Sequence, residues 1–328
     1  MEPRSVGVGA PSILVHLATG LGNIVLATSL LVTLSRRFRT IDLRLDADYP
    51  GAGDLFRDWS ALRAVYDTGA IANGAYEIIV PAIPPFAWPR FSARYRNHAG
   101  LMPRPDDALF YADEQAYYLD FARRLGCAVP QAPQSFVPAF PSPDAGISSA
   151  TLVLAPGCKT GIMAAKRWPH YPELAALFDD VAIVGTPDDL RLFDGTPIRF
   201  PAHARSLVGS LQLRGLAGVL AASGVVVAND SGIAHLSAAL GVPTILLFGP
   251  TPDQTLGRLP PNATVMRAGL PCEPCWLSRP LDACQGRIDC LHSISVESVA
   301  AKVQRALARK HAASNGHGTL HSPESDAR

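Results

Sequence analysis

Short apolar runs alternate with helical patterns along the whole chain. Residues 13–17 form an apolar run that ends shortly before Gly20, which is typical of a buried parallel strand. From Leu26 to Phe38 an apolar residue recurs at every fourth position, which predicts a helix, and residues 41–45 then alternate between apolar and polar types, which predicts a second strand. The chain therefore opens with a strand–helix–strand unit of the kind found in parallel α/β sheets.

A proline-rich passage at residues 130–143 separates two halves that both show this alternation. The first half adds a predicted strand at 77–80 and a predicted helix at 114–125. The second half predicts strands and helices in turn, at residues 151–155, 172–178, 181–185, 211–222, 225–228, 231–240 and 244–248. We therefore predict an α/β protein of two doubly wound, Rossmann-like sheets facing a central cleft, where ligands bind at the carboxyl ends of the strands.

The proline-rich passage also sets the predicted domain boundaries. A chain of 328 residues is long enough for two domains with separate cores. We place the first domain at residues 1–140 and the second at residues 141–312. The remaining residues, 313–328, contain Gly, Ser and Pro and are expected to form a disordered tail.

Composition narrows the classes of function. Hydrophobic residues make up 48% of the chain and charged residues 17%, a balance that fits a compact globular protein. The net charge of +1, without runs of Lys or Arg, argues against a nucleic-acid partner but allows peripheral contact with a membrane. The apolar stretch at 13–34 is interrupted by Gly20, Gly22 and Asn23 and no cleavage site follows it, so we expect no signal peptide or membrane anchor and a cytoplasmic location.

A short polar turn in the second half carries the main candidate chemistry. The apolar strand at 225–228 enters a helix through Asn229-Asp230-Ser231-Gly232. Unpaired backbone amides at the positive end of a helix bind pyrophosphate readily, Asp230 can accept hydrogen bonds from sugar hydroxyls, and His235 can donate to phosphate or sugar. The alternative is that Asp230 or Ser231 only caps the helix.

Several segments in the same order resemble the ADP-heptose:lipopolysaccharide heptosyltransferase family, glycosyltransferase family 9. They are the segment from Asn229 to Thr251, Gly20-Leu21-Gly22-Asn23 after the first strand, Pro156-Gly157 leading to Lys166-Arg167-Trp168-Pro169, and Ile183-Val184-Gly185 with Pro187-Asp188. The resemblance implies a GT-B fold, with the acceptor on the first domain and the sugar nucleotide on the second.

By the same resemblance the chain would be an inverting glycosyltransferase. The implied donor is ADP-heptose and the implied acceptor a glycan or lipid-linked glycan, such as lipopolysaccharide core, at the cytoplasmic face of the membrane. The chemistry would need no metal or other cofactor. In that setting Lys166 and Arg167 would face the cleft and stabilise the departing diphosphate, whereas the alternative is two solvated loop charges.

Asn23 departs from the family pattern. The resemblance places at this position, after the Gly20 and Gly22 loop on the acceptor side, an aspartate that serves as general base. An amide can orient a hydroxyl but cannot accept its proton. Three accounts remain open: another carboxylate does the work, the proton is lost late to solvent or phosphate, or the protein is an impaired or non-catalytic binder. The carboxylates available nearby in sequence are Asp46, Asp48 and Asp54.

A nicotinamide-dependent oxidoreductase is a further alternative. The strand, Gly20-x-Gly22 and helix at the start of the chain loosely suggest a dinucleotide fingerprint. The third glycine of that fingerprint is missing at the required spacing, which weakens this hypothesis.

Four cysteines in a short segment suggest a metal site. The segment 272–290 has the spacing C-x2-C-x8-C-x5-C, with the ligand count of a tetrahedral site for structural zinc or iron. Buried thiols, or two disulfides in an oxidising setting, are the alternatives. The four cysteines are Cys272, Cys275, Cys284 and Cys290.

Overall fold

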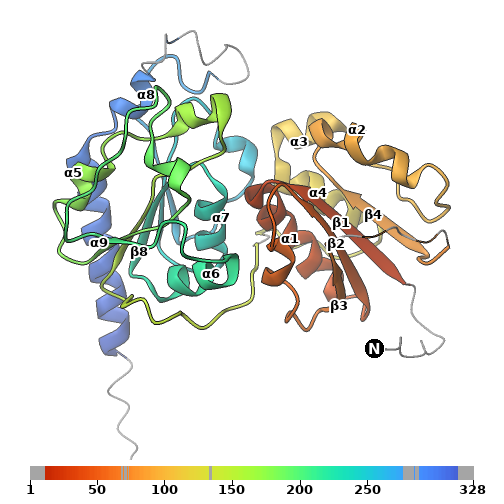
Figure 1. Ribbon diagram of the computed structural model, residues 1–328. Helices are drawn as coiled ribbons and strands as arrows, with labels where there is room; N and C mark the ends of the chain where they lie inside the picture. Colours follow the sequence, from red (N-terminus) through yellow and green to blue (C-terminus); the bar gives the residue numbers. More distant parts are fainter. Residues whose placement is uncertain are drawn as a thin grey trace, which may run out of the picture.

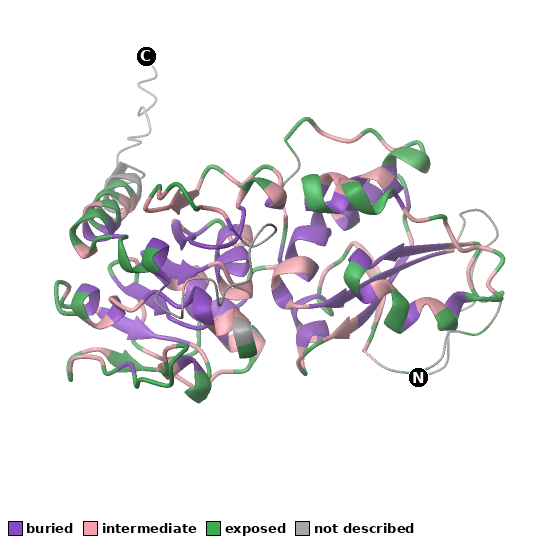
Figure 2. Ribbon diagram, turned by 90° about the horizontal axis from the view of Figure 1, so that it is seen from above, coloured by how far each residue is buried: buried purple, intermediate pink, exposed green. Residues whose placement is uncertain are grey.

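The computed structural model contains two parallel sheets, one in each half of the chain (Figure 1). It describes residues 12–316 except 68, 70, 71, 73, 133, 134, 276–283 and 285–287. The strands at the centre of both sheets are buried, while exposed residues gather on the surrounding helices and loops (Figure 2). The predicted architecture of two Rossmann-like sheets is confirmed.

The first sheet has four parallel strands in the order β3-β2-β1-β4. Its central strand β1 is buried along its whole length, as expected for a parallel strand covered on both faces. The elements of this half are β1 (Ile13–Thr19), α1 (Leu21–Ser35), β2 (Ile41–Ala47), β3 (Leu62–Tyr66), β4 (Ile78–Ala82), α2 (Trp88–Phe91), α3 (Asp107–Ala112) and α4 (Glu114–Arg124).

The second sheet has six parallel strands in the order β10-β9-β8-β5-β6-β7. The strand order reverses direction between β5 and β8, and the carboxyl ends of those two strands therefore open a crevice. The elements are β5 (Leu152–Ala155), α5 (Tyr171–Ala175), β6 (Val181–Ile183), β7 (Arg205–Ser206), α6 (Leu213–Ala222), β8 (Val225–Asn229), α7 (Gly232–Ala239), β9 (Thr244–Leu247), β10 (Ala263–Met266), α8 (Asp289–His292) and α9 (Val296–Gly316).

The strands and helices predicted from the apolar pattern are present, with ends that shift by a few residues. The pattern missed the outer strands β3, β7 and β10, whose residues are only partly buried or exposed and so carry a weaker apolar signal. Helix α9 runs four residues into the segment expected to be a disordered tail. The rest of that tail, 317–328, lies outside the described residues, and the boundary at residue 140 stays a prediction.

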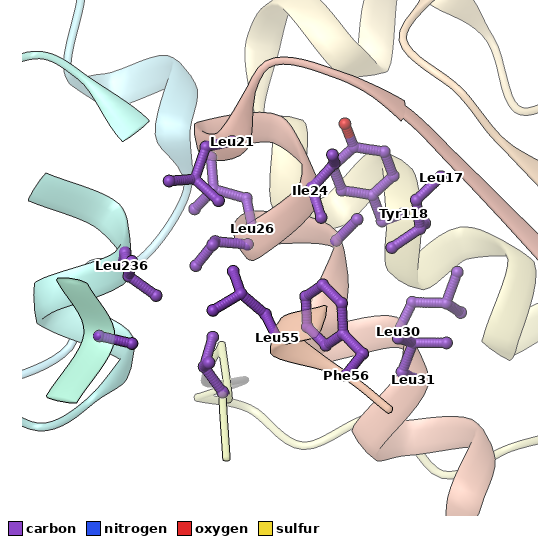
Figure 3. Close-up of a cluster of buried hydrophobic side chains, with 14 of the residues drawn as sticks. Leu17, Leu21, Ile24, Leu26, Leu30, Leu31, Leu55, Phe56, Tyr118 and Leu236 are labelled. Carbon is purple, nitrogen blue, oxygen red and sulfur yellow. The ribbon is translucent and has the colours of Figure 1, made fainter. Parts of the chain in front are cut away.

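Helices α1 and α7 join the two halves. One buried hydrophobic cluster extends from β1 and α1 into β8 and α7. Figure 3 shows Leu236 of α7 facing Leu21 and Leu26 of α1. The two helices therefore share a core, and their starting residues are held at the junction of the two halves.

Glycine is required where the two helices begin. A Cβ added at Gly232 would lie 2.5 Å from Leu21 Cβ, and one added at Gly22 would lie 2.9 Å from His235 Cδ2. Real Cβ atoms do not approach other atoms so closely, so any side chain at either position would push α1 and α7 apart.

Membrane-spanning segments are not among the described helices. In that part of the chain, each helix is too short or too polar to cross a bilayer.

Candidate functional site

The candidate site lies where the carboxyl ends of β1 and β8 enter α1 and α7. Both turns lie at the junction of the two sheets, because the helices that follow them, α1 and α7, pack against each other. The predicted residues Gly20, Gly22 and Asn23 come from the first turn, and Asp230, Ser231, Gly232 and His235 come from the second.

Lys166 and Asp230 form a buried ion pair in the second half. The Lys166 Nζ donates to Asp230 Oδ2 at 2.7 Å, and the two side chains are 8% and 14% exposed. Thr251 Oγ1 donates to the same oxygen at 2.9 Å. The His235 ring lies near the other carboxylate oxygen, with its Nε2 3.8 Å from Asp230 Oδ1. One carboxylate thus gathers a cation, a hydroxyl and an imidazole at the start of α7.

The electrostatics keep Asp230 ionised. Burial alone would raise its pKa, but the charge of Lys166, together with the hydrogen bond and charge of His235, holds the pKa well below the ordinary aspartate value. Asp230 is therefore charged over the whole range of physiological pH.

Asn229, the last residue of β8, fixes the Lys166 loop against this turn. Its Nδ2 donates to the backbone oxygen of Pro156 at 2.6 Å, and its Oδ1 accepts from the Trp168 backbone N–H at 3.0 Å. The residue is fully buried. Its side chain therefore ties the end of β8 to the loop that carries Lys166, a positioning role that the strand pattern did not reveal.

Neither candidate capping residue caps α7. Ser231 is the N-cap residue but its side chain makes no capping hydrogen bond, and its buried Oγ has no partner among the described residues. The Asp230 carboxylate points instead to Lys166 and Thr251. The first turn of α7 contains no acidic side chain. Its backbone amides remain available to an anion from outside the helix.

In the first half, Asn23 connects two side chains. Thr19 Oγ1 donates to Asn23 Oδ1 at 3.1 Å, and Asn23 Nδ2 donates to Glu114 Oε1 at 2.7 Å. Thr19 adopts φ +80°, a backbone conformation that is strained for a β-branched residue and recurs at functional sites. Glu114 was not anticipated from the sequence, because it lies 91 residues from Asn23 and belongs to no recognisable motif.

The three aspartates suggested by proximity in sequence are bound elsewhere. Neither Asp46, Asp48 nor Asp54 makes a hydrogen bond to Asn23 within the described part of the chain. Their partners are cations: Asp46 accepts from Arg44 and Arg94 at 2.8 and 2.7 Å, Asp48 pairs with Arg90 and with Lys159 of the second half, both at 3.3 Å, and Asp54 pairs with Arg57 at 2.9 Å.

Arg167 differs from the expectation that both cations of the loop face the cleft. Its guanidinium donates to the backbone oxygens of Asp188 and Arg191 and lies 3.2 Å from Asp189 Oδ1. The side chain is 4% exposed. Arg167 therefore holds the loop after β6 in place, and Lys166 alone of the two reaches Asp230.

The four cysteines do not form a metal site in the described residues. No group of three or more Cys, His, Asp or Glu side chains there is arranged to hold a metal ion. Cys275 and Cys290 are buried, Cys272 is exposed and Cys284 is half-buried. Burial and the nearby charges of Glu273, Cys275 and Cys272 raise the pKa of Cys290 to about 12. Most of the segment between Cys275 and Cys290 lies outside the described residues.

Comparison with known proteins gives the family. The family model described as "Glycosyltransferase family 9 (heptosyltransferase)" matches residues 121–280, which include Lys166 and the Asp230 turn. Over this stretch, which is just under half of the chain, the protein is similar to glycosyltransferase family 9. The match confirms the resemblance inferred from the sequence motifs.

The curated relatives match the chain over a limited stretch. Lipooligosaccharide heptosyltransferase 2 of Haemophilus influenzae is 34% identical over 122 residues, covering 34% of this chain and 35% of the relative. The match thus spans about a third of that curated relative.

Two solved structures share the fold over most of the chain. The Escherichia coli ADP-heptose lps heptosyltransferase II superposes with a TM-score of 0.64 at 21% identity, covering 92% of this chain and 99% of that one. The dodecameric iron-containing heptosyltransferase TibC, solved with ADP-D-beta-D-heptose, superposes with a TM-score of 0.63 at 15% identity, covering 96% and 81%. These likenesses establish the GT-B fold.

The buried ion pair predicts a pH-dependent loss of stability. Replacing Asp230 by Asn leaves Lys166 buried without a counter-charge, which should lower the free energy of unfolding at neutral pH by roughly 3 kcal/mol. Because folding lowers the pKa of Asp230, its contribution is complete above the ordinary aspartate value and is lost as the pH falls from there through the lowered pKa. The deficit of Asp230→Asn should therefore shrink in acid.

Urea unfolding of both proteins between about pH 3 and pH 7 measures this deficit. Asp54→Asn is the matched control, since Asp54 and its partner Arg57 are 49% and 44% exposed and such a pair contributes less than about 1 kcal/mol. Equal stability of Asp230→Asn and the parent at neutral pH would contradict the assigned pair.

Proposed function

We propose that the chain is an inverting heptosyltransferase that moves heptose from ADP-heptose to a hydroxyl of a glycan acceptor such as lipopolysaccharide core. The observation that carries the proposal is the Lys166–Asp230 pair beside the uncapped start of α7, at the junction with the acceptor-side turn of β1. The names of the related proteins support the donor, since they are heptosyltransferases and one was solved with ADP-heptose bound.

On the donor side, the charged groups suit a departing diphosphate. Lys166 and the amides at Ser231 and Gly232 offer positive charge where the bond between the anomeric carbon and the diphosphate oxygen breaks. Asp230 holds Lys166 in place, and with His235 it can orient the sugar hydroxyls or the phosphates. Arg167 supports this arrangement through its loop rather than by contact with the donor.

On the acceptor side, the first half holds the glycan whose hydroxyl attacks. The Gly20–Asn23 turn faces α7 across the helix junction, so an acceptor held there meets the anomeric carbon from the face opposite the diphosphate. The two halves enclose the reacting atoms, which limits hydrolysis of the donor by water. No metal is needed, because Lys166 and the helix amides provide the charge that a divalent cation would supply.

The turn after β1 is a poor dinucleotide site. The His235 ring of α7 packs against Gly22, so that a Cβ added there would lie 2.9 Å from His235 Cδ2. The space beside this glycine is therefore filled by protein. This geometry and the family assignment disfavour the nicotinamide-dependent alternative.

Nucleotide release tests the function. Purified protein incubated with ADP-heptose and a heptose-deficient lipopolysaccharide core should release ADP in proportion to acceptor. Lys166→Ala should lower kcat by about 10²- to 10³-fold, because it removes one charge that stabilises the leaving diphosphate. Lys302→Ala, at an exposed lysine on α9, is the control and should retain full activity.

Measuring nucleotide release from a panel of sugar nucleotides, with and without acceptor, separates the proposed donor from other donors and from a non-catalytic protein. Release of nucleotide from UDP- or GDP-sugars but not from ADP-heptose would replace the proposed donor. Absence of release from every donor tested, with nucleotide binding retained, would instead support the non-catalytic alternative.

We also propose that the enzyme is cytoplasmic and contacts the inner face of the membrane through the surface near α2 and α3. Phe86 and Tyr111 are 56% and 47% exposed there, and Arg90 of α2 is 63% exposed. The rings of Phe86 and Tyr111 both pack on Phe110, so they form one surface. Exposed aromatic rings beside a cation suit an anionic lipid interface.

Sedimentation with vesicles tests this contact. The protein should pellet with vesicles containing phosphatidylglycerol, and the double variant Phe86→Ser and Tyr111→Ser should bind several-fold less. Leu177→Ser removes an equally exposed apolar side chain, 56%, from the second half and should bind as the parent does. Failure of the parent to pellet would end the membrane proposal while leaving catalysis untouched.

The four-cysteine segment is proposed as a structural site for zinc or iron. The support is the spacing of Cys272, Cys275, Cys284 and Cys290 and the iron contained in the related heptosyltransferase TibC. The described thiols are not arranged as a ligand set, so no step of the reaction is assigned to a metal. Elemental analysis of anaerobically purified protein should give about one metal per chain, lost in Cys275→Ser. Metal-free protein would exclude the site.

A further inference from the structure

Glu114 occupies the junction of the two halves. It is the first residue of α4, is 7% exposed, and holds Asn23 Nδ2 and the Tyr118 hydroxyl on the same oxygen, Oε1, at 2.7 and 2.9 Å. Its second oxygen, Oε2, accepts no hydrogen bond from the described residues. The carboxylate is thus oriented through one oxygen and has the other available to a ligand.

The charges of the donor side reach Glu114. His235 and Asp230, both from the second half, act electrostatically on its carboxyl group. Asn23 of α1 contacts it directly, while Lys166 pairs with Asp230. Of the two described side chains that hydrogen-bond to Asn23, Glu114 carries the carboxylate. It is also close enough to the Asp230 turn to feel the charges there.

We propose that Glu114 is the general base of the transfer and that Asn23, at the position where family 9 enzymes carry an aspartate, holds it in place. This inference rests on the proposed glycosyltransferase function. In this chain the carboxylate would come from the start of α4 instead of from position 23 of α1. The two positions are joined by the hydrogen bond from Asn23 to Glu114 and lie at the same junction.

The step balances as a displacement. The acceptor hydroxyl gives its proton to Glu114 Oε2, and its oxygen forms a bond to the anomeric carbon. The bond from that carbon to the diphosphate oxygen breaks, and its electron pair leaves with ADP. Lys166 and the α7 amides stabilise that charge. Glu114 returns the proton to solvent when the products depart.

The environment makes Glu114 a stronger base than an ordinary glutamate. Burial raises its pKa, and the charge of Asp230 adds to the rise, while the hydrogen bonds from Asn23 and Tyr118 and the charge of His235 oppose it. A higher pKa makes the carboxylate a stronger proton acceptor.

Asp46 shows the opposite behaviour. Burial would raise its pKa, but hydrogen bonds from His16, Arg44 and Arg94 outweigh burial and hold the pKa far below its ordinary value. A carboxylate in that state is a weak base, so Asp46 is a poor candidate for the role.

Exchanging two side chains tests the proposal. Glu114→Gln keeps the size of the residue and should lower kcat about 10²- to 10⁴-fold, with little change in the KM for ADP-heptose. The double variant Asn23→Asp with Glu114→Gln has the carboxylate at position 23 and the amide at position 114. Its kcat should be at least about tenfold higher than that of Glu114→Gln alone. The control is Asp120→Asn on the same helix, which removes a carboxylate paired with Arg124 and should match the parent.

The pH profile separates a base from a structural role. In the parent, kcat should fall as the pH drops through the raised pKa of Glu114, and this acidic limb should vanish in Glu114→Gln. In the exchanged variant a new limb should appear at lower pH, because an aspartate introduced by Asn23→Asp has the lower intrinsic pKa of the two acids. A limb that persists in Glu114→Gln belongs to another group and overturns the assignment.

The outcomes distinguish the two hypotheses. If the parent releases ADP and Glu114→Gln does so at the same rate, the base assignment is wrong and the proposed function stands. If Glu114→Gln loses activity but the exchanged variant recovers none, and both melt at the parent temperature, Glu114 only positions Asn23 and the base assignment is again wrong. If the parent turns over no donor, the proposed function fails and the base assignment fails with it.

Discussion

The close approach of two helix starts is the constraint on which the site depends. Helices α1 and α7 can meet only because Gly22 and Gly232 carry no side chain, and a Cβ at Gly232 would lie 2.5 Å from Leu21 Cβ. Behind this contact the two halves share one hydrophobic core. The contact brings the polar turn of β1 against the polar turn of β8. Without it, the polar groups of the two turns would belong to two separate surfaces.

The same junction gives two carboxylates opposite electrostatic states. Asp230 is surrounded by Lys166, Thr251 and His235, so its pKa is lowered and it stays ionised. Glu114 accepts hydrogen bonds only from neutral donors among the described residues, so burial dominates and its pKa rises. Carboxylates whose pKa values are driven apart in this way can serve different roles, one as a fixed charge and the other as an exchanger of protons.

Periodicity was sufficient to predict the fold, because parallel strands buried on both faces carry continuous apolar runs such as the one at 225–228. The turn between β8 and α7 could be located from the sequence as well, since its residues are consecutive and follow an apolar strand. Its role in donor binding stays a prediction. Arg167 was beyond such reasoning. Its neighbour Lys166 has the same charge, and only the three-dimensional course of the loop after β6 decides that the Arg167 guanidinium is bound by backbone oxygens.

Glu114 shows why a departure from a motif can mislead. Judged by the α1 turn alone, Asn23 implies that the base is missing from this position. Proximity in sequence then draws attention to Asp46, Asp48 and Asp54. Those aspartates are neutralised by arginines and a lysine. The carboxylate that reaches Asn23 comes from a helix 91 residues away, which the fold places against the turn. An amide at position 23 is then consistent with activity, since two carboxylates at 2.7 Å would repel, whereas an amide donates a hydrogen bond to its partner.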